Sequence, residues 1–181
     1  MMATINNLSI YQASVKDIPV IQALSKQTFP ATYRNIITLE QSDYMMDMMY
    51  STASLTKQME EEHHTYLIAC LDGEPVGYVS VQPLAEKEEG MDVVELQKIY
   101  VLPTFQGQHI GQFLFDEAEK LIKTIHPAPC MMELHVNRYN KALAFYEHQG
   151  MRKLRQGDYP IGHDFFMNDY IMGKELRHND L

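Results

Sequence analysis

The stretch Val93–Lys123, VVELQKIYVLPTFQGQHIGQFLFDEAEKLIK, decides the fold. Its first part is apolar and rich in β-branched residues, which predicts a strand that ends near the proline after Val101. A turn containing Gly107 follows, and apolar residues from Ile110 onward then recur at helical spacing. A strand that passes into a helix leaves backbone amides without partners at the helix N-terminus. Those amides and the helix dipole predict a binding site for an anion such as a pyrophosphate.

Length and composition predict one soluble, cytoplasmic domain over residues 1–181. Hydrophobic residues make up 45% of the chain and charged residues 22%, as in ordinary globular proteins. The formal net charge of −9 argues against nucleic acid as a partner, because phosphate binding needs a basic face. The acidic charge either favours a cationic substrate or only keeps the protein soluble. We expect no membrane span and no signal peptide, and Cys70 and Cys130 are expected to be buried free thiols.

The pattern of the whole chain predicts a mixed α/β order, β-α-α-α-β-β-β-α-β-α-β-β, with at least one parallel pair of strands. Two segments are predicted as loops, the charged AEKEEGMD at 85–92 and GDYPIGHD at 157–164. In the N-terminal half we expect a strand at 9–13, helices at 14–29, 38–50 and 54–62, and a hairpin that turns at Asp72-Gly73 and resumes after Pro75. In the C-terminal half we expect a strand at 130–136, a helix that follows Asn140 and stops at Gly150, and strands at 151–155 and 165–176.

One hexapeptide, Gln106-Gly107-Gln108-His109-Ile110-Gly111, resembles the Q/R-x-x-G-x-G/A motif of the GCN5-related N-acetyltransferases, the GNAT superfamily. The preceding IYVLPTF resembles the strand that leads into that motif, and DGEPVGYVSV resembles the family's hairpin. Asn137, Asn140 and the segment AFYEHQG at 144–150 resemble its later pattern. These matches cover residues 65–154. The stretches at 27–33, 44–51 and 161–176 resemble PaiA-type polyamine acetyltransferases, which extends the resemblance to most of the chain.

The resemblance implies a mixed, mostly antiparallel twisted sheet of six to seven strands, with a central splayed parallel pair and helices on both faces. It implies acetyl-CoA as cosubstrate and direct transfer to a primary amine, a polyamine or other small alkyl amine, in a ternary complex. A protein or peptide N-acetyltransferase and a non-catalytic acyl-CoA-binding sensor stay open as alternatives. A homodimer is expected. The acidic residues available to a cationic acceptor include Asp43, Asp47, Glu86, Glu88, Glu89 and Asp164.

Acetyl transfer to an amine needs a proton acceptor, because an alkyl ammonium has a pKa of roughly 10 and only the neutral amine attacks. The resemblance makes Glu95 the candidate base, and the alternative is a charge that faces water where the strand begins. It makes Tyr146 the candidate proton donor to the leaving thiolate, and the alternative is a core aromatic on an amphipathic helix. Alternation along the strand predicts Glu95, Gln97, Ile99 and Val101 on one face.

Position 109 departs from the family pattern, which usually has Gly where this chain has His109. His109 fits this turn if its φ is negative, as in the first turn of a helix, and its imidazole either bonds a phosphate oxygen or points to solvent. Asn137 and Asn140 either contact the cofactor or cap the following helix. No histidine spacing matches a metal motif, so no metal site is expected. The resemblance implies cofactor binding by Ile99, Tyr100, Val101, Gln106, Gly107, Gln108, His109, Ile110, Gly111, Gln112, Asn137, Asn140 and Tyr146.

Overall fold

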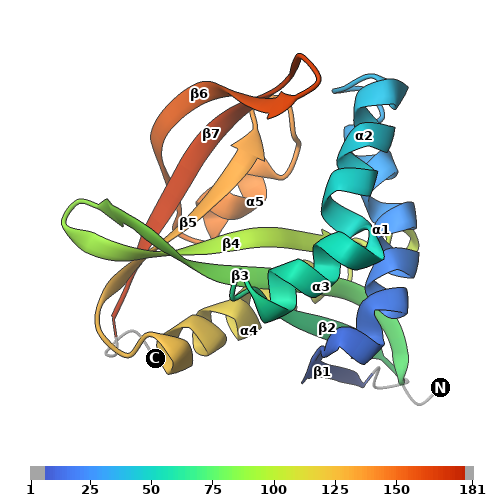
Figure 1. The fold of residues 1–181 in the computed structure, drawn as a ribbon. Helices are drawn as coiled ribbons and strands as arrows, with labels where there is room; N and C mark the ends of the chain where they lie inside the picture. The colour runs from blue at the N-terminus through green and yellow to red at the C-terminus, as the bar shows by residue number, and fades with distance from the viewer. Residues whose placement is uncertain (1–6, 178–181) are drawn as a thin grey trace.

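A computed structural model describes residues 7–177, which form a twisted seven-stranded sheet (Figure 1). The strand order is β1-β2-β3-β4-β5-β7-β6. Within the described part of the chain, β4 and β5 pair in parallel and the other neighbours pair antiparallel, as predicted. The strands are β1 (Leu8–Gln12), β2 (Thr65–Leu71), β3 (Glu74–Glu88), β4 (Met91–Val101), β5 (Cys130–Asn137), β6 (Arg152–Gly162) and β7 (Phe165–Leu176).

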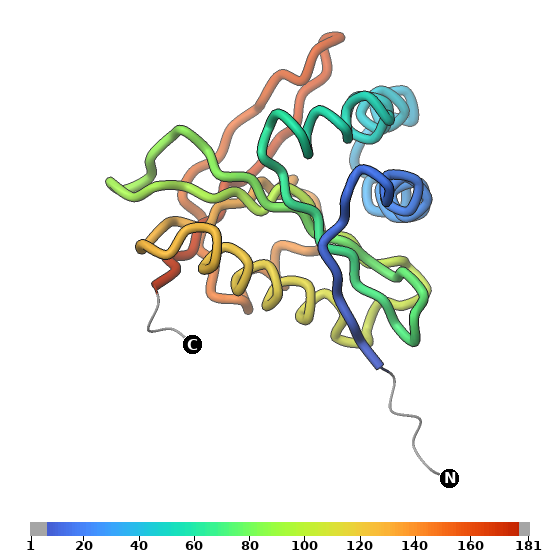
Figure 2. The backbone as a smooth tube through the Cα atoms, turned by 60° about the horizontal axis from the view of Figure 1, so that its bottom comes forward, coloured from blue at the N-terminus to red at the C-terminus, as the bar shows by residue number. Residues whose placement is uncertain are grey.

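Helices cover both faces of the sheet (Figures 1 and 2). Three helices, α1 (Ile18–Tyr33), α2 (Leu39–Tyr50) and α3 (Thr52–Glu60), bury one face in a core that includes Phe29, Tyr66 and Tyr78. The helices α4 (Ile110–Ile125) and α5 (Leu143–His148) cover the other face, where Leu114 and Phe115 are fully buried. Short 3₁₀ turns at Val15–Asp17 and Pro103–Phe105 precede α1 and α4. No helix of residues 7–177 has the length and apolar character needed to cross a membrane.

The predicted helix starts at Ser14 and Thr38 are confirmed by their hydrogen bonds. The amide of Ser14 donates to Asp17 Oδ2 at 2.8 Å, and the Thr38 hydroxyl accepts from the amide of Gln41 at 3.1 Å. However, α1 runs four residues beyond the predicted end, through Pro30 to Tyr33. Because Tyr33 is buried in the core, tertiary packing holds a last turn that the proline alone would disfavour.

The predicted loop at 85–92 is wrong, because β3 and β4 continue through it as a long hairpin. The turn occupies only Glu89 and Gly90, whose φ angles are +51° and +80°. Lys87 Nζ lies 2.5 Å from Asp92 Oδ1 across the strands. Charge alone suggested a loop here, but charged side chains suit exposed strands when opposite charges face one another across the pair.

The predicted loop at 157–164 is also wrong, because β6 extends to Gly162 and turns only at His163 and Asp164. The Tyr44 hydroxyl of α2 donates to the Ile161 carbonyl at 2.7 Å and thereby ties the tip of this hairpin to the opposite layer. The predicted start of β3 after Pro75 is likewise late, since pairing begins at Glu74 and a register shift at Cys70 accommodates the proline.

A bulge in β4 changes which side chains face each core. Ser80 pairs with Lys98 while Val81 pairs with Leu96, so Gln97 is the extra residue. Ile99 and Val101 therefore pack against the core on the α4 side, whereas Tyr100 packs against the core on the α1 side.

The prediction that Glu95 shares a face with Ile99 and Val101 is therefore wrong. Val94 and Leu96, which flank Glu95, belong to the core on the α4 side, so Glu95 lies on the opposite face. The bulge then keeps Lys98 on that same face as Glu95. An insertion of one residue in a strand reverses every side chain after it, and the sequence pattern gives no sign of it.

Candidate active site

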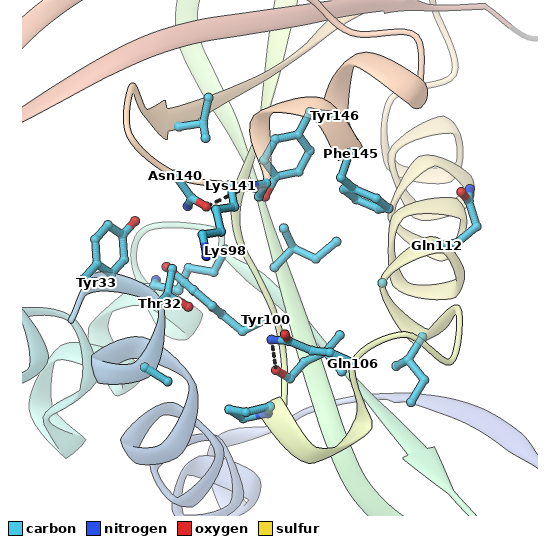
Figure 3. A pocket seen from close by; sticks show the side chains of 18 of the residues that line it. Thr32, Tyr33, Lys98, Tyr100, Gln106, Gln112, Asn140, Lys141, Phe145 and Tyr146 are labelled. Atoms are coloured by element: carbon cyan, nitrogen blue, oxygen red, sulfur yellow. Dashed lines mark hydrogen bonds between the residues drawn. The ribbon is translucent and has the colours of Figure 1, made fainter. Parts of the chain in front are cut away.

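A cavity of about 1100 Å³ opens where β4 and β5 separate (Figure 3). The two strands pair only from Asp92 to Glu95 with Cys130 to Glu133, although both continue well beyond those residues. The edge of β4 that faces β5 is therefore without a strand partner from residue 96 onward. The walls are formed by the end of α1 and the turn after it, by 96–101 of β4, by the entry to α4, by His135 and Val136 of β5, and by residues at 139–149.

The N-terminus of α4 forms one end of this cavity. Ile110, Gly111 and Gln112 line it, and the first amides of a helix have no acceptor within the helix. The N-cap residue, His109, makes no side-chain capping bond. Unpaired amides and the positive end of the helix dipole therefore face the cavity, as the sequence predicted, and suit an anionic ligand.

His109 has φ +61° and ψ 18°, so the condition of a negative φ is not met. The chain turns from the 3₁₀ segment into α4 through two left-handed residues, Gly107 at φ +82° and His109. A glycine takes this conformation with least strain, which agrees with the usual residue at this position in the resembled family. The His109 side chain is exposed at the rim of the cavity.

Most of the expected cofactor residues come together around the cavity. Ile99, Tyr100 and Val101 supply the β4 wall, and the Gln106 side chain donates to the Val101 carbonyl at 3.4 Å. The residues at 106, 107 and 109–112 follow at the entry to α4, and Asn140 and Tyr146 complete the set. Gln108, Asn137 and Glu95 do not line the cavity.

Asn137 and Asn140 both build the turn that precedes α5. The Asn137 side chain accepts from the amide of Tyr139 at 3.0 Å, and Asn140 accepts from the amide of Ala142 at 2.9 Å. Asn137 is buried, while Asn140 also reaches the cavity wall. Both asparagines therefore stabilise the turn before α5, and of the two only Asn140 can contact a ligand in the cavity.

Tyr146 lies on α5 and Tyr33 on α1, and Figure 3 shows them on different sides of the cavity. Burial raises the pKa of Tyr146 above its usual value, and the neighbouring Tyr33 adds to this. The phenol thus stays protonated at neutral pH and is available as a hydrogen donor.

Glu95 is buried beneath the cavity wall. Its Oε2 accepts from the Gln97 side chain at 3.1 Å, and its Oε1 lies 3.9 Å from His135 Nε2. Burial raises the pKa of Glu95, against the opposing effects of His135, Gln97 and Lys98. Glu95 does not line the cavity, whereas His135 does.

His135 is a site residue that sequence reasoning did not select. On the opposite ring edge from Glu95, its Nδ1 lies 3.4 Å from Oδ2 of Asp169 on β7. The sequence contains a pattern that could have identified it: in the strand CMMELHVN, Glu133 and His135 alternate with apolar residues and so share one polar face. Which carboxylates meet that face depends on the pairing of β5 with β4 and β7.

Lys98 is the second site residue that sequence reasoning missed. It lines the cavity, and its Nζ donates to Gln58 Oε1 at 3.0 Å and to the Tyr66 hydroxyl at 2.8 Å. Burial lowers its pKa to about 7, although Glu95 and Glu62 oppose the change. A lysine within an apolar strand could have identified it from the sequence, but the bulge at Gln97 determines which face of the sheet Lys98 occupies.

Carboxylates surround the cavity without lining it. None of the Asp or Glu side chains in residues 7–177 forms part of its wall, and this includes all six that the sequence offered to a cationic acceptor. Glu95 and Asp169 instead lie 3.9 and 3.4 Å from the ring nitrogens of His135, which lines the cavity, and Glu133 pairs across from Glu95 in the sheet.

Comparison with known proteins places these features in a family. The sequence pattern of the acetyltransferase (GNAT) family matches residues 29–151. The spermidine N(1)-acetyltransferase of Thermoplasma acidophilum is 25% identical over 166 residues, which are 89% of this chain and 96% of that protein. The N-acetyltransferase YjgM of Escherichia coli is 29% identical over 151 residues, 80% of this chain and 86% of that one. The crystal structure of PaiA N-acetyltransferase from Thermoplasma acidophilum in complex with coenzyme A has a TM-score of 0.75 at 22% identity, covering 94% and 99% of the two chains.

Proposed function

Since this chain belongs to the acetyltransferase (GNAT) family and is an N-acetyltransferase, we propose that it acetylates a primary amine of a polyamine or other small alkyl amine. The observation that carries the proposal is a cavity that joins the uncapped N-terminus of α4 to the polar residues where β4 and β5 separate. The relative named for spermidine supports the choice of acceptor, and the neighbour in complex with coenzyme A supports acetyl-CoA as donor.

The residues at one end of the cavity fit the phosphates of coenzyme A. Unpaired amides at Ile110 and Gly111 suit a pyrophosphate, and Lys141 on the cavity wall offers a cation. The edge of β4 along Ile99 to Val101 has no strand beside it, so its backbone groups suit the amides of a pantetheine arm. Acetyl-CoA would supply an activated acyl group as a thioester, and the chain's own residues would orient it.

The other end of the cavity suits the amine. The carboxylates behind His135 give this end a negative potential, which favours an ammonium group over a neutral or anionic one. Tyr146 lines the cavity, and its phenol, which is protonated at neutral pH, is the proposed proton donor to the departing thiolate. Because one cavity joins the two proposed binding ends, we expect direct transfer in a ternary complex rather than transfer through an acetylated enzyme.

An acetylation assay tests the proposal. The protein is incubated with acetyl-CoA and a panel that contains spermidine, alkyl monoamines and peptides with free N-termini, and products are identified by mass spectrometry. We expect acetylated spermidine or alkyl amine, and double-reciprocal plots that intersect when both substrates are varied. Acetylation of the peptides alone would contradict the proposed acceptor, and coenzyme A binding without turnover of any amine would contradict the enzyme's proposed role.

A further inference from the structure

We propose that His135 accepts the proton of the acceptor's ammonium group and that Asp169 is the residue that positions it for this step. This inference rests on the proposed function and adds to it the path by which the amine loses its proton. It also gives Glu95 a different task from that of a direct base. Glu95 would act on the imidazole and not on the amine.

The geometry points to His135 because it is the most exposed of three interacting side chains, His135, Glu95 and Asp169. Its side chain is 39% exposed and lines the cavity, while those of Glu95 and Asp169 are 11% and 7% exposed. An amine in the cavity can meet the imidazole without any movement of the sheet. Neither carboxylate lines the cavity.

Asp169 can fix the ring so that one nitrogen is free to accept. An N–H at Nδ1 faces Asp169 Oδ2 at 3.4 Å, which leaves the lone pair on Nε2, the nitrogen that lies 3.9 Å from Glu95 Oε1. The edge of the ring meets Tyr159 of β6 at 5.2 Å between ring centroids, and this contact limits its rotation. The other oxygen of Asp169, Oδ1, is buried and has no hydrogen-bond partner within the described part of the chain.

Three carboxylates favour the protonated form of His135. The charged or titratable groups that face it are Asp169 from β7, Glu95 from β4, Glu133 from β5 and the phenol of Tyr159 from β6. Burial opposes the imidazolium, but the hydrogen bond to Asp169 and the charges of the carboxylates outweigh it and raise the pKa of His135. A base whose pKa lies near the working pH is the most effective one.

The proton balance is simple. The proton leaves the ammonium nitrogen for Nε2, and the electron pair of that N–H bond stays on the nitrogen as the nucleophilic lone pair. The imidazolium carries the charge between Asp169 and Glu95 and returns the proton to water after the product leaves. No metal or redox partner is needed for this step.

Dependence of kcat on pH, at saturating acetyl-CoA and amine, tests this assignment. We expect log kcat of the wild type to rise with pH and to level off above an inflection higher than 6.5, the ordinary imidazole value. His135→Gln should lower kcat on the order of 10²-fold and remove the inflection. Asp169→Asn should keep an inflection but move it to lower pH, because the substitution keeps a hydrogen-bond acceptor and removes a charge. A merely structural role for Asp169 would not move it.

His126 provides a matched control. Its Nε2 lies 3.0 Å from Asp92 Oδ2 after the end of α4, outside the cavity, and this carboxylate likewise raises its pKa. His126→Gln should therefore leave kcat and its pH profile unchanged. In addition, millimolar imidazole should restore part of the activity of His135→Ala, since the cavity admits it.

Wild-type kcat and an unchanged inflection in His135→Gln would overturn the inference while the proposed function stands. Loss of the inflection in Glu95→Gln but not in His135→Gln would also overturn it, in favour of Glu95 as the base. An imidazole pKa of His135 below 6.5, measured by NMR titration of the wild type, would do the same without any activity readout. By contrast, if the wild type acetylates no amine, the proposed function itself fails.

Discussion

Lys98→Met should stabilise the protein at neutral pH and remove part of the dependence of its stability on pH. Lys98 is 6% exposed, two aromatic rings and two polar oxygens surround its ammonium group, and no carboxylate of residues 7–177 forms an ion pair with it. Methionine has nearly the same length and no charge. The two oxygens are not orphaned by the change, because the Tyr66 hydroxyl also donates to Gln58 Oε1 at 2.5 Å.

The magnitude follows from the pKa of Lys98. Lowering it from 10.5 to about 7 corresponds to a cost of about 5 kcal/mol for the protonated form in the folded protein, an upper bound for the gain on removing the charge. Between these two values the unfolded chain holds a proton that the folded chain has released, so the free energy of unfolding of the wild type rises with pH. From pH 7 to pH 9 this rise in the free energy of unfolding amounts to about 2 kcal/mol. The full cost of burying the protonated lysine applies at pH values below the folded-state pKa of about 7.

Urea unfolding of both proteins at pH 7 and at pH 9 measures the effect. The advantage of Lys98→Met over the wild type should shrink by about 2 kcal/mol at the higher pH, because only the wild type gains from deprotonation. All other groups titrate alike in the two proteins and cancel in the difference. A stability difference that is equal at both pH values would refute the inference that Lys98 carries a strongly lowered pKa.

Three further predictions concern the cavity and its walls. Tyr146→Phe should lower kcat on the order of 10²-fold while coenzyme A affinity, measured by calorimetry, changes little; unchanged turnover would remove Tyr146 from its proposed role. Gly77→Ala should cost about 1–3 kcal/mol in thermal or urea unfolding, because the new Cβ would lie 2.7 Å from the Tyr100 carbonyl oxygen. Gly111→Ala is its control. The new Cβ would lie 3.7 Å from the Phe145 ring, so the substitution should lower the free energy of unfolding by less than about 1 kcal/mol. His109→Gly should retain coenzyme A affinity within about threefold, since glycine takes the same left-handed conformation; a tenfold loss would show that the imidazole binds the ligand.

The order of the elements was predictable because each carries its own local signal. The turn at Asp72-Gly73, the cap at Ser14 and the helical spacing after Ile110 all act within a few residues. The hairpins at 85–92 and 157–164 were not predictable from the same signals. Their strands are exposed and charged or proline-containing. Distant residues hold them: Arg152 donates to Glu89 in the first hairpin, and Tyr44 donates to Ile161 in the second.

The site divides in the same way. The helix N-terminus at one end of the cavity was predictable, because a strand, a turn and a helix follow one another along the chain from Val93. The group around His135 was not, because His135 meets Glu95 and Asp169 only through the pairing of three strands. The orientation of Lys98 depends on one extra residue in β4, which the alternation of apolar residues does not reveal.

Transfer of an isotopically labelled acetyl group is the decisive measurement. The protein is mixed with acetyl-CoA labelled in the acetyl group and with spermidine or an alkyl monoamine, and NMR follows the label in time. We predict that the thioester signal is replaced by that of an amide on the amine, and that this replacement needs the protein. A label that stays on the thioester, or that appears only as free acetate, would contradict acetyl transfer to a small amine in this cavity.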